Sequence, residues 1–191
     1  MSLLLLLRPY LGFLRVYTAH NLAAPLVFTL LILLRARECT AYRFIRYVYD
    51  IVRFMAIWLA FSCTVLYWSF VWYDITLLDG RKYQGSLPDN AHLHHTFPLL
   101  YTLLLALFHP QADPIPRSHL MFWAIVHVTG YFTFIHSTSH TGFPYPFMNT
   151  LSTPAWIEMY CSALLCAVLF AWEYARVDVR AVLLTRKVKA E

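Results

Sequence analysis

Charged residues are scarce in this chain of 191 amino acids. Asp, Glu, Lys and Arg make up 13% of it, whereas a soluble domain usually carries about 25%. The hydrophobic fraction is 60%, and the mean hydropathy is +0.54. The scarcity of charge excludes an ordinary soluble domain and predicts an integral membrane protein.

Cysteine is also scarce, with four residues. Cys63, Cys161 and Cys166 fall inside apolar stretches and Cys39 in a basic one, so the spacing gives no disulfide framework. The net charge of +5 is carried by loops and the tail. We interpret it as a signal for membrane orientation and anionic-lipid contact, and not for nucleic-acid binding.

Long apolar stretches predict an all-α fold, a polytopic transmembrane helix bundle in a single domain. Since a span needs about 20 apolar residues, the length allows five or six spans. The predicted spans cover residues 16–34, 48–73, 92–108, 119–135 and 155–172. The abundant Trp, Tyr and Phe suit aromatic belts at the membrane interfaces. We expect the protein in the endoplasmic reticulum or the plasma membrane.

Basic residues predict how the chain is oriented. Arginines cluster between the first two predicted spans, and Lys and Arg cluster in the tail, so both regions are expected in the cytoplasm. The opposite, non-cytoplasmic face of the membrane then holds the starts of the first and third spans and the end of the fourth. This topology predicts that several polar residues gather at one membrane depth: Thr18, His20, His92, His94, His95, His136 and His140.

Two polar clusters interrupt the apolar pattern. Residues 90–98 read Asn-Ala-His-Leu-His-His-Thr-Phe-Pro, and residues 136–140 read His-Ser-Thr-Ser-His. Titratable groups at membrane depth are costly and indicate function by default. His92 and His95 would share one helical face, and His136 and His140 would end a polar stripe that includes Thr129 and Thr133. His127 lies in mid-span and is expected to be a buried, hydrogen-bonded imidazole.

Three kinds of function fit these clusters. A histidine could act as general base for a Thr or Ser nucleophile that attacks a lipid acyl ester. Alternatively, the histidines could hold metal ions, as in membrane hydroxylases and desaturases, because imidazole suits iron and zinc. The third is a non-enzymatic lipid-binding or transport protein that uses the polar stripe as a ligand path.

The His92-Leu-His-His95-Thr96 segment, preceded by Asn90, resembles the Asn-His-x-x-His-Thr signature of the androgen-induced gene 1 family. The resemblance continues at Gly130-Tyr131, His140-Thr-Gly142, Tyr145-Pro146-Phe147 and Trp172-Glu173. It implies a multi-pass membrane hydrolase that cleaves fatty acid esters of hydroxy fatty acids, taken from the bilayer. It also implies a threonine nucleophile, a histidine, and no metal or other cofactor.

The family histidine maps to His95, and His94 stays open because Asn90 stands one residue early. The family threonine begins an early span, where Thr18 is the closest position. Thr29 competes, but it lies near the other end of that span, about 15 Å or more from His95 in depth. If Thr18 is not the nucleophile, Thr138 or Ser139 is next. The predicted supporting or substrate-binding residues are His92, His94, Thr96, His136 and His140. The oligomeric state stays open.

Overall fold

The computed structural model describes residues 17–38, 42–74, 91–109, 111, 113, 115–139, 143 and 145–188. Within these ranges, the side chains of Thr18, Arg37, Asp74, Pro146 and residues 178–188 are not described. The secondary structure in the described ranges is helical and includes no strand, so the predicted all-α fold is confirmed. In chain order the elements are α2 (Tyr17–Leu33), η1 (Ala36–Glu38), α3 (Arg43–Asp74), α5 (Ala91–His95), α6 (Phe97–Phe108), α7 (Arg117–Ser137), η3 (Pro146–Thr150) and α8 (Thr153–Val188).

Each predicted span overlaps an apolar helix, and the third overlaps both α5 and α6. Among the described residues, three helical segments are long and apolar enough to cross a membrane: Arg43–Tyr73, Arg117–Ser137 and Thr153–Val177. Two others are apolar but shorter, Ala19–Leu33 and Phe97–Phe108. The number of membrane crossings stays a prediction.

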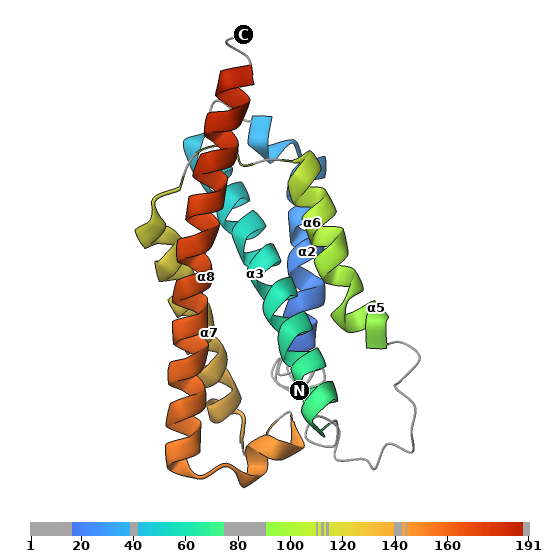
Figure 1. The fold of residues 1–191 in the computed structure, drawn as a ribbon, viewed down its shortest axis with the longest axis vertical. Coiled ribbons are helices and arrows are strands. Elements are labelled where there is room, and N and C mark those ends of the chain that lie inside the picture. Colours follow the sequence, from blue (N-terminus) through green and yellow to red (C-terminus); the bar gives the residue numbers. More distant parts are fainter. Residues whose placement is uncertain are drawn as a thin grey trace, which may run out of the picture.

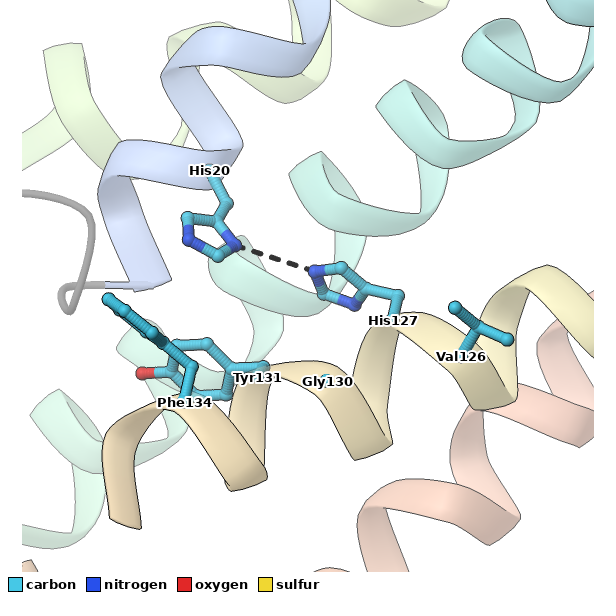
Figure 2. A pocket seen from close by; sticks show the side chains of 6 residues that line it. All are labelled: His20, Val126, His127, Gly130, Tyr131 and Phe134. Atoms are coloured by element: carbon cyan, nitrogen blue, oxygen red, sulfur yellow. Dashed lines mark hydrogen bonds between the residues drawn. The ribbon is translucent and has the colours of Figure 1, made fainter. Parts of the chain in front are cut away.

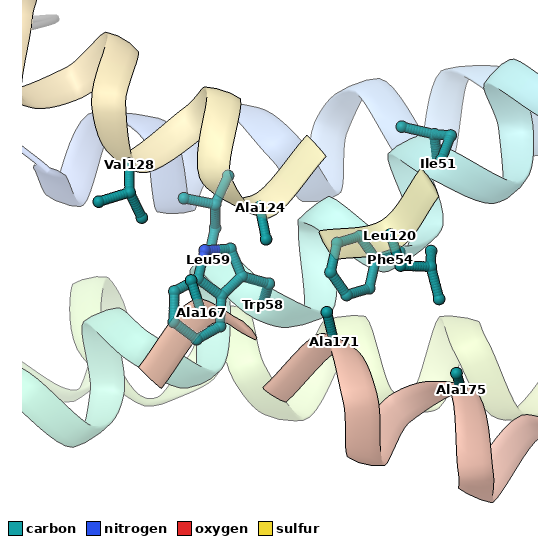
Figure 3. Packing of buried hydrophobic residues seen from close by; sticks show 10 residues of the cluster. All are labelled: Ile51, Phe54, Trp58, Leu59, Leu120, Ala124, Val128, Ala167, Ala171 and Ala175. Carbon is teal, nitrogen blue, oxygen red and sulfur yellow. The ribbon is translucent and has the colours of Figure 1, made fainter. Parts of the chain in front are cut away.

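The helices form two groups that α3 connects. Helices α2 and α6 pack against one part of α3, and α7 and α8 pack mainly against each other (Figure 1). Between α3, α7 and α8 lies a core in which the buried residues of α8 are alanines (Figure 3), with larger α8 side chains such as Phe170 and Tyr174 packed against its edge. These alanines recur every fourth residue, which places them on one face and lets the helices approach closely. The buried residues are Ile51, Phe54, Trp58, Leu59, Leu120, Ala124, Val128, Ala167, Ala171 and Ala175.

The start of α2, the end of α3, the short α5 and the end of α7 lie toward the same end of the bundle (Figure 1). This is the grouping that the sequence predicted from the alternation of spans. The described polar residues predicted to act together therefore lie toward one end of the bundle (Figure 1). The side-chain contacts decide which of them meet.

The opposite part of α3 carries buried charges. Asp50 and Arg53 are only 1% and 7% exposed. Asp50 Oδ2 accepts a hydrogen bond of 2.9 Å from the backbone N–H of Asp113. Arg53 donates to the Tyr174 hydroxyl and, at 3.4 Å, to the Ala106 carbonyl. These contacts fasten α3 to α6, to α8 and to the segment that follows α6.

Candidate active site

The site begins with a break between α5 and α6 that Pro98 explains. In a continuous helix the N–H of residue 98 would donate to the His94 carbonyl, but proline has no N–H. The next donor, the Leu99 N–H, bonds to the Thr96 carbonyl at 3.1 Å instead of reaching His95. The carbonyls of His94 and His95 therefore need donors from outside their own helix.

Helices α2 and α3 each supply one of these donors. Asn21 of α2, whose side chain is fully buried, donates from Nδ2 to the His94 carbonyl at 3.0 Å. The Thr64 hydroxyl of α3 contacts the His95 carbonyl, and it also lies 2.7 Å from the Ala60 carbonyl. The backbone that carries His94 and His95 is thus held between α2 and α3.

The His95 ring is fixed by two further side chains of α3. The Tyr67 ring stacks on it in parallel, with ring centroids 3.6 Å apart and an interplanar angle of 3°. Cys63 Sγ lies 3.6 Å from His95 Nδ1. A proton on Nδ1 that points at the sulfur would leave the Nε2 lone pair available as a base.

His92 and Thr96 form a layer next to Trp68. The indole N–H of Trp68 donates to the Thr96 hydroxyl at 3.0 Å, and His92 Nδ1 lies 3.3 Å from the same oxygen. The His92 ring packs on Trp68 at 4.7 Å between centroids. Of the three neighbouring histidines, His95 has the most firmly positioned ring. The His94 ring makes an edge contact with the His95 ring, with centroids 6.4 Å apart.

The polar stripe of α7 faces α8 and not the His92–His95 region. His136 packs against Trp156 with centroids 4.5 Å apart, and its Nδ1 lies 2.9 Å from the Phe132 carbonyl. Thr129 bonds to Tyr160 at 2.9 Å. His140 lies outside the described residues. The structure therefore brings His92, His94, His95 and Thr96 together but places His136 on another surface of the bundle.

The two threonines of α2 occupy different levels. Thr18 is the second residue of α2, three residues before Asn21, and its side chain lies outside the described part. The Thr29 hydroxyl lies 2.8 Å from both the Tyr101 hydroxyl and the Pro25 carbonyl. Since Tyr101 follows His95 by six residues, Thr29 belongs to a layer about 9 Å farther along the helices.

A second pair of imidazoles lies between α2 and α7. His20 Nδ1 is 3.5 Å from His127 Nε2 (Figure 2). The Tyr17 ring packs edge-on against Tyr131, with ring centroids 5.1 Å apart. Tyr17 also bonds through its hydroxyl to Ser62 of α3 at 2.9 Å. The sequence assigned neither His20 nor His127 to the site.

No contiguous motif marks the residues that position His95, and they were not predicted. Cys63, Thr64 and Tyr67 share one face of α3, as their spacing of one, three and four residues allows. Only the packing of α5 on that face gives them their role. Pro98, four residues after His94, was the local signal that a neighbouring helix would have to supply a donor. No three of the described His, Cys, Asp and Glu side chains are grouped so that they could hold a metal ion.

A family model described as FAR-17a/AIG1-like protein matches residues 10–175. The chain belongs to this family. The match confirms the resemblance drawn from the sequence motifs and identifies a membrane protein of the FAR-17a/AIG1-like family. The matched range contains Thr18, the His92–His95 region and His136. Comparison with curated proteins and with solved structures gave no match.

Proposed function

We propose that this protein is an intramembrane hydrolase of lipid carboxylic esters, with Thr18 as nucleophile and His95 as general base. The observation that carries the proposal is the hydrogen bond from Asn21 to the His94 carbonyl. It joins α2, one turn beyond Thr18, to the residue beside His95. The family resemblance favours fatty acid esters of hydroxy fatty acids, which enter from the bilayer.

Distance along α2 favours Thr18 over Thr29. A general base has to come within about 2.6–3.2 Å of the hydroxyl that it deprotonates. Thr18 precedes Asn21 by three residues, a rise of about 4.5 Å, whereas Thr29 follows it by eight residues, a rise of about 12 Å. The Thr29 hydroxyl is also engaged with Tyr101 and Pro25.

The chemistry then follows the usual order for acyl transfer. His95 Nε2 takes the Thr18 hydroxyl proton as the oxygen attacks the ester carbonyl, and the same proton passes to the departing alkoxide. Water hydrolyses the resulting acyl-threonine with His95 again as base. Cys63 and Tyr67 keep the imidazole in one orientation, and Trp68 supports His92 and Thr96 beside it. In this proposal His94, His136 and His140 support the site or line the substrate path.

The decisive experiment combines turnover with covalent labelling. The purified full chain is assayed with a fatty acid ester of a hydroxy fatty acid and with a phosphonate probe for hydroxyl nucleophiles. We expect Thr18→Ala to lose both signals and Thr18→Ser to keep both. Thr18→Asn keeps a small polar side chain in the first turn of α2 but removes the hydroxyl, so it should insert normally yet stay inactive. Thr29→Ala is the matched control and should still label.

Labelling of Thr18→Ala would overturn the assignment. Cys63 is the described nucleophilic side chain closest to a His95 ring nitrogen, so Cys63→Ala belongs in the same experiment. Loss of labelling in Cys63→Ala with full labelling in Thr18→Ala would make Cys63 the nucleophile. Stoichiometric iron or zinc in the active protein would instead favour a metal-dependent lipid hydroxylase or desaturase.

The orientation that accompanies this function is also a proposal. The segments around residues 80–85 and 144–148 should lie on the non-cytoplasmic side, and the basic tail should lie in the cytoplasm. Glycosylation acceptors engineered into the first two segments should be modified, and acceptors in the tail should not. Modification of the tail would invert this topology.

A further inference from the structure

The His20–His127 pair lies in an open, apolar pocket between α2 and α7. The pocket has a volume of about 330 Å³. His20 reaches into it from α2, and every other lining residue belongs to α7 (Figure 2). The lining residues are His20, Val126, His127, Gly130, Tyr131 and Phe134.

The imidazole pair is a poor helix–helix fastener. Its nitrogen–nitrogen separation of 3.5 Å exceeds the usual 2.7–3.2 Å range of a strong hydrogen bond. His127 Nδ1 is buried and has no hydrogen-bond partner among the described residues. An imidazole is costly in apolar surroundings at membrane depth, so a role limited to weak packing accounts poorly for His127.

Gly130 keeps the pocket open. A Cβ added at this residue would meet no atom within 4 Å. The glycine is therefore not required for a close approach of α7 to another described helix. Its effect is to leave room beside His127, and a methyl group at this residue would meet no neighbouring helix.

We propose that this pocket binds a single-chain lipid carboxylate, with the carboxylate at His20 and His127 and the chain along Val126 and Phe134. A volume of about 330 Å³ is near the lower end of ligand pockets, about 300–1,000 Å³, so it suits the head and first part of one acyl chain. Imidazole N–H groups donate to carboxylates, and the bond strengthens when the imidazole is charged. The inference goes beyond ester hydrolysis and does not depend on Thr18 being a nucleophile.

The pocket is separate from the His95 region although both use α2. Asn21 of α2 bonds to the His94 carbonyl, whereas His20, the preceding residue, contacts α7. Successive helical residues point about 100° apart, so one helix can serve two sites. Occupancy of the pocket can therefore be measured without reference to turnover.

The test uses photo-crosslinking of the full chain in phosphatidylcholine nanodiscs. The probe is palmitic acid with a diazirine near the carboxyl end, and its control is the corresponding hexadecanol. We expect the acid to label peptides from the 126–134 region and unlabelled palmitate to compete. The proposal is wrong if the alcohol labels the wild-type protein as strongly as the acid does. It is also wrong if the acid crosslinks only to other helices.

Matched variants identify the groups responsible. His127→Phe and His20→Phe keep ring volume but remove the donors, and each should weaken palmitate binding about tenfold or more. Gly130→Leu should abolish binding by filling the pocket, whereas Gly130→Ala should retain most of it. All four are compared at equal thermal stability. Unchanged palmitate affinity in folded Gly130→Leu and His127→Phe would contradict the assigned pocket.

Discussion

The two ends of α3 both bury polar groups, but they use them differently. At the Arg53 end, the guanidinium satisfies the Ala106 carbonyl in the last turn of α6 and contacts the Tyr174 hydroxyl. A cation is favourable there because the last carbonyls of a helix lack intrahelical donors. At this end the charged side chain of Arg53 itself holds α3 to α6 and α8.

At the His95 end, the fasteners are Asn21 and Thr64, which bind the backbone carbonyls of α5. The His95 imidazole takes no part in that fastening. Its described contacts use Nδ1 and the ring face, and Nε2 makes no hydrogen bond with the described residues. The polar groups that hold the helices together make their hydrogen bonds to neighbouring helices. The His95 ring is instead held in place by other side chains, and its Nε2 remains available to act as a base.

The largest effect should come from His95 itself. His95→Ala should lower the turnover of a fatty acid ester of a hydroxy fatty acid by about 10²–10⁴-fold, because it removes the general base. Thermal stability should change little, since the carbonyl contacts of residue 95 remain. His94→Ala is the control and should keep most of the activity. Near-normal turnover in His95→Ala together with loss in His94→Ala would move the base by one residue.

Replacing Arg53 should lower stability and leave turnover unchanged, the opposite of the effect expected at His95. Arg53→Met removes the donor to the buried Ala106 carbonyl and the contact with the Tyr174 hydroxyl, which should reduce the free energy of unfolding by about 1–3 kcal/mol. Turnover per folded molecule should stay the same. The measurements are thermal unfolding in detergent and activity normalised to folded protein.

Arg176→Met is the matched control for that change. Arg176 and Glu173 pair at 2.9 Å, but their side chains are 45% and 58% exposed. Exposed pairs contribute about 0.2–1 kcal/mol, so this variant should be near neutral. If Arg53→Met stays stable but loses turnover, Arg53 contributes to activity and is not a purely structural residue.

The sequence could predict the helices because long apolar stretches determine them locally. It could also predict that His92 and Thr96 lie together, since their motif is contiguous. Their roles and that of His95 stay predictions. It could not predict Cys63, Tyr67 or Asn21 as their partners, because those roles depend on which helices become neighbours. The His20–His127 contact joins residues 107 positions apart, and no periodicity within either helix reports such a pair.

A coupling energy between two residues tests the explanation of the break before α6. Asn21→Leu keeps the side-chain size but leaves the His94 carbonyl without its donor, so it should cost about 1–3 kcal/mol in unfolding free energy. Pro98→Ala restores a backbone N–H that can serve the same carbonyl in a continuous helix. The two changes should therefore be non-additive. In the Pro98→Ala background, Asn21→Leu should cost about 1 kcal/mol less than in the wild type.

The double-mutant cycle is measured by thermal and denaturant unfolding in one detergent. Thr102→Val in α6 serves as the control for Asn21→Leu: Thr102 is buried and its hydroxyl bonds to the Pro98 carbonyl within its own helix. Its cost should not fall when Pro98 becomes alanine. If the unfolding free energy changes of Asn21→Leu and Pro98→Ala simply add, Asn21 does not stabilise the protein through the His94 carbonyl.

Turnover of the Pro98→Ala single variant adds a second readout. If a continuous helix rotates His95 away from the first turn of α2, activity should fall while stability does not, and the role of the break would then be to aim the imidazole.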